Sequence, residues 1–421
     1  MKREKVVYLP KGNPCYGSVG TEKNIVLTPL PNSEISCKFD TFMLRILCSG
    51  ILSAGLVACL SSGAPKVETE PFGSLSTGQP VTLYRMTNTQ GASVEVIDYG
   101  CRVVRICVPD RAGRLSDVVV GYGDIASFES GSERFFGALI GRYANRINGA
   151  RFELDGDTVS LTANEMLEGK PVHLHGGIQG FDRVMWRGEP LREASRSGVR
   201  FTRLSPDGEE GYPGNLDCTV TYWWTEDNVL RIEYEAETDA PTIVNLSNHT
   251  YFNLKGADGG SVMDHVLRVN ADLYLQNNAQ FVPEGPALPV EGTPFDMREP
   301  HRLDYALEIP NRQIEIMKGF SVCWVLRNQT DTLAAAADLY DPESGRSVEV
   351  WTTEPGLLTY TGRSLNEKMI GKDRKPLYPF AGMLLETLHF ADSPNRPDFP
   401  TTVLRPGEHY RSVTEFRFRV H

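Results

Sequence analysis

Hydrophobic and polar residues alternate in short segments along most of the chain from residue 81 onward. Alternation with a period of two predicts strands that bury one face. Turns rich in glycine, proline and asparagine separate the segments, as at residues 88–91 and 109–113. The segments predicted as strands are 81–84, 93–97, 102–108, 118–120, 218–224, 230–236, 266–269, 347–351 and 413–420.

Helical patterns are weak by comparison. No long segment combines a helical hydrophobic period with capping residues. Strands do not alternate with helices, which disfavours a parallel α/β sheet, and no fixed-period repeat of the propeller type is present. The sequence therefore predicts an all-β protein, a large antiparallel β-sandwich that residues 79–421 form as one domain.

The most apolar segment lies near the N-terminus, at residues 46–60. It is shorter than the roughly 20 residues that a membrane-spanning helix needs, and it fits the apolar core of a secretory signal. Its end, Leu56-Val57-Ala58-Cys59, resembles a bacterial lipobox, in which the cysteine is lipidated and becomes the new N-terminus.

Met43 and Arg45 would give such a signal a conventional basic start. We therefore expect export in a bacterium as a periplasmic or outer-membrane protein. A lipid on Cys59 would be its only contact with the membrane. An ordinary cleaved signal and a buried helix in a cytoplasmic protein stay open as alternatives. The predicted divisions are a non-native extension at 1–42, a lipoprotein signal peptide at 43–59, a tether at 60–78 and the β-sandwich domain at 79–421.

Charge and cysteine usage narrow the classes of partner. The formal net charge is −11, whereas a nucleic-acid partner requires a basic face. The eight cysteines are scattered without a C-x-x-C pair, so neither a structural zinc site nor a dense disulfide framework is expected. Walker loops, nucleophile elbows and complete dinucleotide motifs are missing, and we expect no cofactor.

Two histidines, His173 and His175, precede a pair of glycines. In a strand both would face the same side, but zinc would need a third ligand, and none stands out by its spacing. Metal binding and a structural role for both stay as alternatives. The hypothesis that we favour is one catalytic imidazole beside glycines that let a ligand approach closely.

Two further segments carry groups suited to acid–base chemistry. His249 lies among hydrogen-bonding and aromatic residues at 247–254, a combination that suits sugar hydroxyls and the C–H face of a sugar ring. Glu386 is a lone carboxylate in the apolar run 382–388. Burying an unpaired carboxylate is costly, so this residue is either paired or functional, and burial would raise its pKa.

Together these segments resemble the aldose 1-epimerase, or galactose mutarotase, family. The resemblance covers residue 81 to the C-terminus, and its specificity comes from many motifs in a consistent order. The motifs are Asp110-Arg111 with Gly113, residues 141–147 (GRYANRI), 174–177 (LHGG), 180–182 (GFD) with Trp186, 205–214 (SPDGEEGYPG), 248–254 (NHTYFNL), 293–296 (TPFD), 385–387 (LET), 392–395 (DSPN) and 404–408 (LRPGE).

The resemblance implies a galactose mutarotase-like supersandwich with its site in an open cleft. It also implies a cofactor-free isomerase that interconverts the α and β anomers of a free monosaccharide such as galactose or glucose. Glu386 would be the general base on the anomeric hydroxyl, His249 the general acid on the ring oxygen, and His175 would assist at that oxygen. The residues implied to hold sugar hydroxyls are Asn145, Arg146, Tyr251 and Asp296.

The sequence also departs from the family pattern. A Gly-Tyr/Phe-Asp-His-Asn segment is common there, and Gly319-Phe320-Ser321-Val322-Cys323 stands in its place. Two usual glutamines are Leu358 and Leu388, and a usual asparagine is Arg363. These changes bear on the sugar more than on the reaction, and we expect Leu358 rather than Leu388 to be a neighbour of the sugar. Packing of both leucines in the core is the alternative.

Three other functions are compatible with parts of this pattern. A non-catalytic carbohydrate-binding sandwich would not need both His249 and Glu386. A sugar-phosphate 1-epimerase would need additional basic residues at the cleft, and only Arg363 favours it. A glycoside hydrolase would usually need two carboxylates, and only Glu386 and Asp296 offer themselves.

Overall fold

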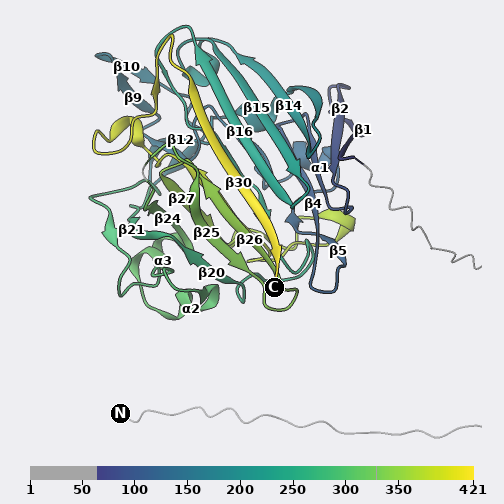
Figure 1. The fold of residues 1–421 in the computed structure, drawn as a ribbon. Coiled ribbons are helices and arrows are strands. Elements are labelled where there is room, and N and C mark those ends of the chain that lie inside the picture. The colour runs from purple at the N-terminus through teal and green to yellow at the C-terminus, as the bar shows by residue number, and fades with distance from the viewer. Residues whose placement is uncertain (1–63, 329) are drawn as a thin grey trace, which may run out of the picture. The chain divides into compact units, whose positions relative to one another are not determined.

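The computed structural model describes residues 64–328 and 330–421 (Figure 1). Strands dominate this part of the chain, and the three α-helices among these residues have six residues each. Neighbouring strands in both large sheets pair antiparallel. The predicted all-β antiparallel sandwich is therefore confirmed. None of the helices that the structure describes could cross a bilayer by its length and hydropathy.

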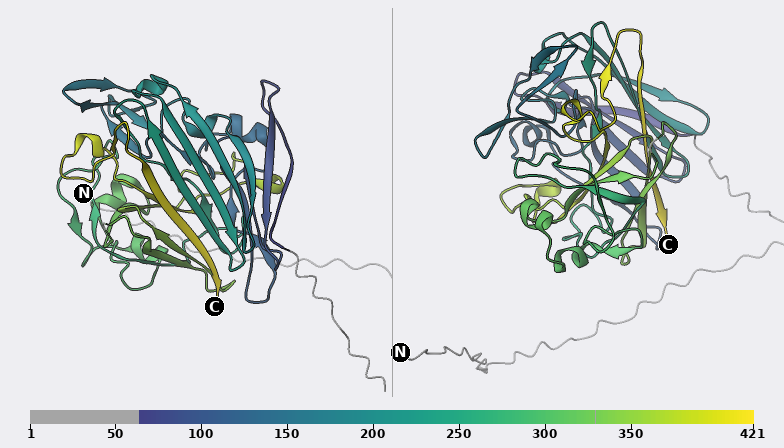
Figure 2. Two further views of the ribbon diagram at one scale, coloured as in Figure 1. Left: turned by 45° about the horizontal axis from the view of Figure 1, so that its top comes forward. Right: turned by 90° about the vertical axis from the view of Figure 1, so that its left-hand side faces the viewer.

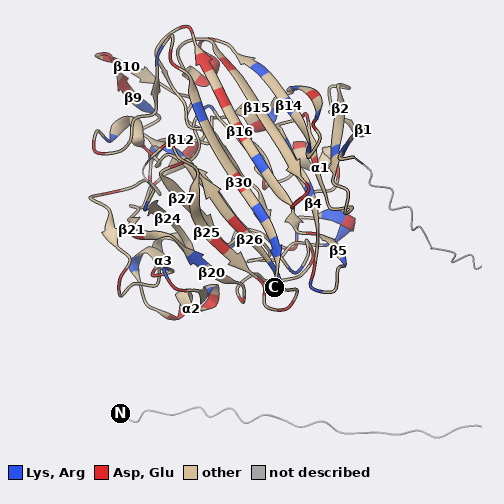
Figure 3. Cartoon of the chain, in the orientation of Figure 1, with Lys and Arg blue, Asp and Glu red and all other residues tan. Residues whose placement is uncertain are grey.

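A nine-stranded sheet forms one face of the molecule, and its long strands lie side by side in Figures 1 and 2. Charged residues of both signs lie along its long strands (Figure 3), where Arg231 forms ion pairs with Glu233 and Glu415 at 2.7 Å each. In spatial order the strands are β13 (Arg187–Arg192), β14 (Arg196–Ser205), β15 (Leu216–Thr225), β16 (Val229–Thr238), β30 (Tyr410–Val420), β26 (Arg346–Thr352), β25 (Ala334–Tyr340), β20 (Val266–Val269) and β23 (His301–Arg302).

A seven-stranded sheet supplies the floor of the candidate site. Its order places β28 between β27 and β19, although these three strands are far apart in sequence. In spatial order the strands are β22 (Leu288–Pro289), β21 (Ala271–Leu275), β24 (Ser321–Leu326), β27 (Gly356–Tyr360), β28 (Met383–Leu388), β19 (Tyr251–Phe252) and β6 (Val119–Val120).

The third sheet corrects the predicted domain boundary. It has five strands in sequence order, β1 (Lys66–Ser74), β2 (Pro80–Thr87), β3 (Ser93–Ile97), β4 (Arg102–Pro109) and β5 (Leu115–Asp117). Strand β1 pairs with β2 along its length, and Val67 is buried in the core. The prediction of a tether at 60–78 is therefore wrong for β1, where β-branched and charged residues form an edge strand. The predicted segments 1–42 and 43–59 lie outside the described residues.

The remaining elements are short and connect the three sheets. The small sheets are β11 (Glu165–Leu167), β12 (Lys170–Leu174) with β8 (Arg146–Asn148); β10 (Asp157–Ser160) with β9 (Arg151–Leu154); β17 (Thr242–Ile243) with β29 (Val403–Leu404); and β18 (Ser247–Asn248) with β7 (Leu139–Ile140). The helices are α1 (Ile125–Ser130), α2 (Leu303–Glu308), α3 (Arg312–Met317) and the 3₁₀ turns Phe181–Arg183, Glu209–Gly211, Lys372–Arg374 and Ser393–Asn395.

One large apolar core joins the three sheets. Trp224 and Phe416 come from the nine-stranded sheet, Val96 from the five-stranded sheet, and Trp324 and Leu385 from the seven-stranded sheet. All are nearly or fully buried, and burial of this apolar surface is the main favourable term in folding. The alternate residues of the seven-stranded sheet are therefore available to face away from this core.

Candidate active site

Strand β28 presents two kinds of surface because its side chains alternate between faces. Met383 and Leu385 belong to the central core. Leu384 and Glu386 therefore point to the opposite face, where Leu384 lines a cleft of about 620 Å³. The side chain of Glu386 is fully buried and is not part of the cleft lining, although its neighbours Leu358 and His249 are.

The strand register brings distant residues into two rows across this face. Glu386 lies opposite Leu358, which lies opposite Cys323, and Leu384 lies opposite both Tyr251 and Tyr360. His249 lies in the two-residue gap between β18 and β19, where its backbone bonds to residues 137 and 138, and its ring comes close to Glu386. We call Cys323, Leu358, Glu386 and His249 the acid–base row, and Ser321, Tyr360, Leu384 and Tyr251 the adjacent row.

His175 reaches the acid–base row from a loop. Strand β12 ends at Leu174, and His175 adopts a left-handed backbone with φ of 48°. Its Nδ1 accepts a hydrogen bond from the backbone N–H of Asn145 at 3.1 Å. The backbone N–H of His175 donates to the Asn145 carbonyl oxygen at 2.9 Å. Because Nδ1 is an acceptor, the neutral ring carries its proton on Nε2.

The expectation that His173 and His175 share one face is wrong, because the strand stops between them. The Nδ1–H of His173 donates to the Thr162 carbonyl oxygen at 2.7 Å, and its Nε2 accepts from the Tyr212 hydroxyl at 2.6 Å. Both ring nitrogens are therefore used within the protein. Burial lowers the pKa of His173 to about 4, so this histidine is a neutral structural residue.

The glycine after His175 is required by space. Gly176 has φ of +82°, and a Cβ atom built on it would lie 1.8 Å from the Gly141 carbonyl oxygen. No other residue type fits between these two loops without moving one of them. The backbone contact thus fixes the position at which His175 enters the cleft.

His175, His249 and Glu386 converge at one point. The nitrogen and oxygen atoms through which they could bind a ligand all lie within 4.8 Å of one another. The two imidazoles are perpendicular with centroids 5.1 Å apart, and Phe135 packs against both at 4.7 and 5.6 Å. Arg134 lies over the Phe135 ring. The structure therefore brings together the three residues predicted to be catalytic.

Burial shifts the pKa values of the three groups in opposite directions. Loss of hydration raises the pKa of Glu386 to about 8 and lowers that of His249 to about 3. Burial and the neighbouring His249 hold the pKa of His175 well below its usual range. In the free cleft at neutral pH, Glu386 is therefore mostly protonated and both histidines are neutral.

Several polar atoms at this point have no partner within the described part of the protein. Both carboxylate oxygens of Glu386, Nδ1 of His249 and Oδ1 of Asn145 are buried and make no hydrogen bond there. The adjacent Ser247 hydroxyl donates to the Thr387 carbonyl oxygen instead. Because buried polar groups are normally satisfied, this cluster indicates a place for a polar ligand.

Three of the four predicted sugar contacts line the same cleft. They are Asn145, Arg146 and Tyr251. The Arg146 guanidinium is held by Glu165 through hydrogen bonds of 2.8 and 3.2 Å, which leaves part of its donor edge for a ligand. Tyr251 is nearly fully buried beside His249.

Asp296 does not line the cleft. Its carboxylate accepts two hydrogen bonds from Arg298, at 2.8 and 2.7 Å. Phe295 and Met297 on either side of it are fully buried in the core, whereas the Asp296 side chain is partly exposed and pairs with Arg298. The resemblance to the family thus placed a structural carboxylate in the predicted site.

Of the residues that depart from the family pattern, some line the cleft and others do not. Ser321 and Leu358 line the cleft. Leu388 is fully buried and packs with Ala138, Ile140 and Ala144, as a core residue does. Arg363 is exposed and does not line the cleft.

Sequence reasoning missed Glu133, Phe135 and Tyr360, which also line the cleft. Burial raises the pKa of Glu133 to about 7. Glu133 and Phe135 come from the loop between α1 and β7, which precedes the recognised motif at 141–147 and has no strand pattern. Only the proximity of this loop to the motif could have suggested them, because its position follows from tertiary packing.

His175, His249 and Glu386 are also a set of potential metal ligands, although the sequence predicted no metal. Zinc sites often combine two histidines with a carboxylate. His175 can offer only Nε2, because its Nδ1 accepts the Asn145 N–H. Metal-free action therefore stays a prediction, which activity in a chelator tests directly.

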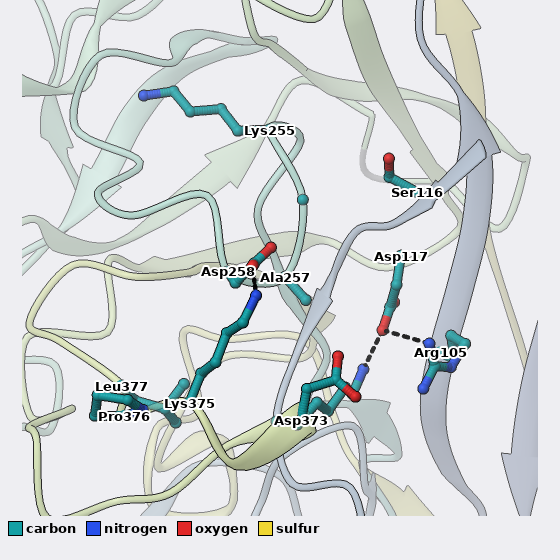
Figure 4. Close-up of a pocket in the computed structure, with 13 residues that line it drawn as sticks. Arg105, Ser116, Asp117, Lys255, Ala257, Asp258, Asp373, Lys375, Pro376 and Leu377 are labelled. Carbon is teal, nitrogen blue, oxygen red and sulfur yellow. Dashed lines mark hydrogen bonds and ion pairs between the residues drawn. The ribbon is translucent and has the colours of Figure 1, made fainter. Parts of the chain in front are cut away.

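A second cavity, of about 250 Å³, lies between the β4–β6 region and the loop before β28 (Figure 4). Its cations are already engaged. Lys372 donates to Asp117 and to the Val119 carbonyl oxygen at 2.7 Å, and Lys375 pairs with Asp258. None of its lining residues is a histidine. This cavity therefore offers neither the acid–base pair nor a free anion-binding group.

The fold and the site define a β-sandwich with a buried acid–base cluster in a polar cleft. A family model described as "Aldose 1-epimerase" matches residues 82–417. Galactose mutarotase of Rattus norvegicus is 39% identical over 350 residues, covering 83% of this chain and 97% of the relative. Aldose 1-epimerase of Escherichia coli K12 is 34% identical over 343 residues, covering 81% and 96%.

Solved structures agree with these sequence matches. The galactose 1-epimerase of Lactobacillus acidophilus NCFM superposes with a TM-score of 0.74 at 25% identity, covering 85% of this chain and 99% of that one. The chain therefore belongs to the aldose 1-epimerase family.

Proposed function

We propose that the protein is an aldose 1-epimerase, an isomerase that interconverts the α and β anomers of a free aldose by opening and closing its ring. The observation that carries this proposal is the convergence of His175, His249 and Glu386, whose ligand atoms lie within 4.8 Å of one another and include buried atoms of Glu386 and His249 without a hydrogen bond in the described part of the chain. The family relationship supports the same reaction.

Ring opening requires one proton to leave the anomeric hydroxyl and another to reach the ring oxygen. Glu386 accepts the first proton and His249 donates the second, which yields the open-chain aldehyde. His175, fixed by Asn145, donates its Nε2–H toward the ring oxygen. Rotation about the C1–C2 bond exposes the other face of the aldehyde, and closure returns both protons.

The free cleft already holds the right number of protons. At neutral pH the pair carries one proton, which resides on Glu386 because burial disfavours both charged groups. The reactive form has the same proton on His249, so no exchange with solvent is needed before ring opening. The two groups together therefore carry one proton between about pH 3 and about pH 8.

The cleft supplies polar and aromatic groups around this pair. Arg146 and the Asn145 side chain are positioned to bind sugar hydroxyls, while Tyr251, Tyr360 and Phe135 provide aromatic surface. Arg146 is held by Glu165 and Phe135 by Arg134. These supports reduce the ordering that sugar binding would otherwise require.

Alternative functions fit the cleft less well. A phosphorylated sugar would need free cations, but Arg134 is held by Asp182 at 2.6 Å, Arg146 by Glu165, and Arg363 is outside the lining. A non-catalytic sugar-binding protein would gain nothing from an unpaired buried carboxylate such as Glu386, whose burial is costly.

Polarimetry with freshly dissolved α-glucose, α-galactose and a pentose tests the proposal. The protein should accelerate mutarotation of at least one of these sugars above the spontaneous rate, with EDTA present. A protein that accelerates none of them is not an aldose 1-epimerase.

We also propose that the protein is exported and anchored through a lipid on Cys59, on the strength of the lipobox-like Leu56–Cys59 segment. In a bacterial host with the lipoprotein pathway, intact mass should show a mature chain that begins at lipidated Cys59. Cys59→Ser should release the protein from the membrane fraction. A mature chain that retains residues 1–42 contradicts this proposal.

A further inference from the structure

The order of strands in the acid–base row defines which part of a sugar lies over which side chain. Glu386 stands on β28, Leu358 lies opposite it on β27, and His249 comes from the segment just before β19, on the other side of β28. Directly paired residues on adjacent strands have Cβ atoms about 4.5–5.5 Å apart, which is the scale of a sugar ring. The order in space is therefore the acid His249, the base Glu386 and then Leu358.

The anomeric carbon C1 has three heavy neighbours, namely its hydroxyl oxygen, the ring oxygen and C2. On the proposed function, the hydroxyl oxygen is at Glu386 and the ring oxygen is at His249. The two remaining positions on C1, which C2 and hydrogen occupy, both lie on the side away from the ring oxygen, and Leu358 of β27 stands on that side of Glu386. The substituent on C2 then faces Leu358.

That side of the cleft is apolar. Leu275, Cys323 and Phe390 form a buried apolar cluster, and Leu358 packs against it. The thiol of Cys323, next in the row, is buried and is at best a weak donor. Neither side chain of the row beyond Glu386 offers the strong hydrogen bond that a hydroxyl loses on leaving water.

We propose that this enzyme takes 2-deoxy aldoses as substrates about as readily as the corresponding 2-hydroxy sugars, because Leu358 bounds the cleft beside C2. The inference rests on the proposed function, since it uses the assigned places of the two oxygens. A site built to bind a hydroxyl rejects the analogue that lacks it, whereas an apolar wall gives little discrimination.

The test compares glucose with 2-deoxyglucose, and uses 6-deoxyglucose as the positional control, after subtraction of each spontaneous rate. For the wild-type protein, kcat/KM for glucose and 2-deoxyglucose should agree within about threefold, less than the roughly tenfold that one neutral hydrogen bond supplies. A preference for glucose above about tenfold overturns the inference.

Two variants of one position sharpen the comparison. Leu358→Gln should raise the preference for glucose over 2-deoxyglucose by about tenfold and leave the ratio of glucose to 6-deoxyglucose unchanged. Leu358→Met, which keeps the apolar surface, should leave both ratios unchanged. A Leu358→Gln effect on the 6-deoxyglucose ratio alone, or on all three sugars equally, refutes the placement of C2.

The wild-type comparison decides the matter even if Leu358→Gln fails to fold. Activity on glucose with strong rejection of 2-deoxyglucose leaves the proposed function intact and removes only this inference. A protein that accelerates none of the three sugars removes both.

Discussion

Glu386 on β28 and His249, just before β19, lie close together, yet burial shifts their pKa values in opposite directions. It raises the pKa of the carboxyl to about 8 and lowers that of the imidazole to about 3. Neither shift comes from an ion pair, since burial is the largest cause of each. The properties of each residue therefore depend on the closed surroundings that the fold gives it.

Removal of either proposed acid–base group should slow the reaction strongly. We expect Glu386→Gln and His249→Asn each to lower kcat by about 10²–10⁴-fold, the usual contribution of a positioned acid or base. Both changes nearly preserve shape, so circular dichroism should show an intact fold. A folded Glu386→Gln enzyme with wild-type kcat contradicts the assignment of the base.

The pH profile follows from the single shared proton. We expect kcat/KM of the wild-type enzyme to be flat near neutral pH and to fall above about pH 8, where the pair loses its last proton. It should also fall toward pH 3, where His249 gains a second proton. A kcat/KM that instead rises through pH 8 would show that Glu386 must be ionised while His249 is neutral.

The raised pKa of Glu386 also makes the stability of the folded protein depend on pH. The folded state binds this proton more tightly than the unfolded chain, so the contribution is fully present below about pH 4.5 and is lost as the pH rises to about 8. Glu386→Gln should therefore gain Tm relative to wild type as the pH rises across this interval. The exposed Glu68→Gln serves as the control for loss of a charge and should show no such trend.

Glu386 and His249 could be found from sequence because a lone carboxylate in an apolar run and a histidine among aromatic residues are local signals. Asp296 shows the limit of that reasoning. Its motif is local too, but the side on which its carboxylate lies depends on Phe295 entering the core and on Arg298 two residues away. Such choices are made by packing, which a single sequence does not display.

At the scale of elements, the loop after β12 does what the strand pattern alone did not predict. An extended continuation would have aligned His175 with His173, but the left-handed turn at His175 directs it into the cleft. Gly176 lets two backbones meet at that turn. The strands themselves were largely predicted, whereas β1 was missed because a charged edge strand resembles a polar linker.

Two glycines with similar backbone angles allow a controlled test of this loop. Gly176 has φ of +82° and Gly208 has φ of +80°, but a Cβ at Gly208 would meet nothing within 4 Å. Alanine is strained by the positive φ at both positions, whereas only Gly176→Ala also clashes with a neighbouring backbone. We expect Gly176→Ala to lose at least about tenfold in kcat/KM, as displacement of an active-site group does, and Gly208→Ala to keep wild-type activity.

Equal loss of activity in the two glycine variants would show that backbone strain, rather than the contact with Gly141, governs the loop. Thermal unfolding of both proteins separates the two effects. A lower Tm for both variants with a loss of activity for only one is the expected result.

At the scale of the molecule, the described domain begins with β1 rather than at residue 79. Val67 enters the core, its carbonyl oxygen accepts a hydrogen bond from Arg192 at 2.8 Å, and Phe72 packs against Phe128. These contacts join β1 to the strands and the helix beside it. The boundary cannot be read from hydrophobic alternation, because only one residue of β1 is fully buried.

Truncation tests this boundary. A chain that begins at Ala64 should fold and keep wild-type kcat/KM, since every residue of the candidate site lies beyond that point. A chain that begins at Gln79 should unfold at a lower temperature, because it exposes the β2 edge and removes the Val67 and Phe72 contacts. Equal Tm values for the two chains would show that β1 does not stabilise the domain and acts only as a linker.

The two rows of the seven-stranded sheet separate what must stay constant in such an enzyme from what can vary. Glu386 stands on β28 and His249 directly precedes β19, which pairs with β28, so backbone pairing beside the two residues maintains their spacing. A substitution at another position of the sheet, such as Leu358, exchanges one side chain without altering the distance between the proton donor and the proton acceptor. New sugars can thus be accommodated one position at a time, while the reaction itself is inherited unchanged.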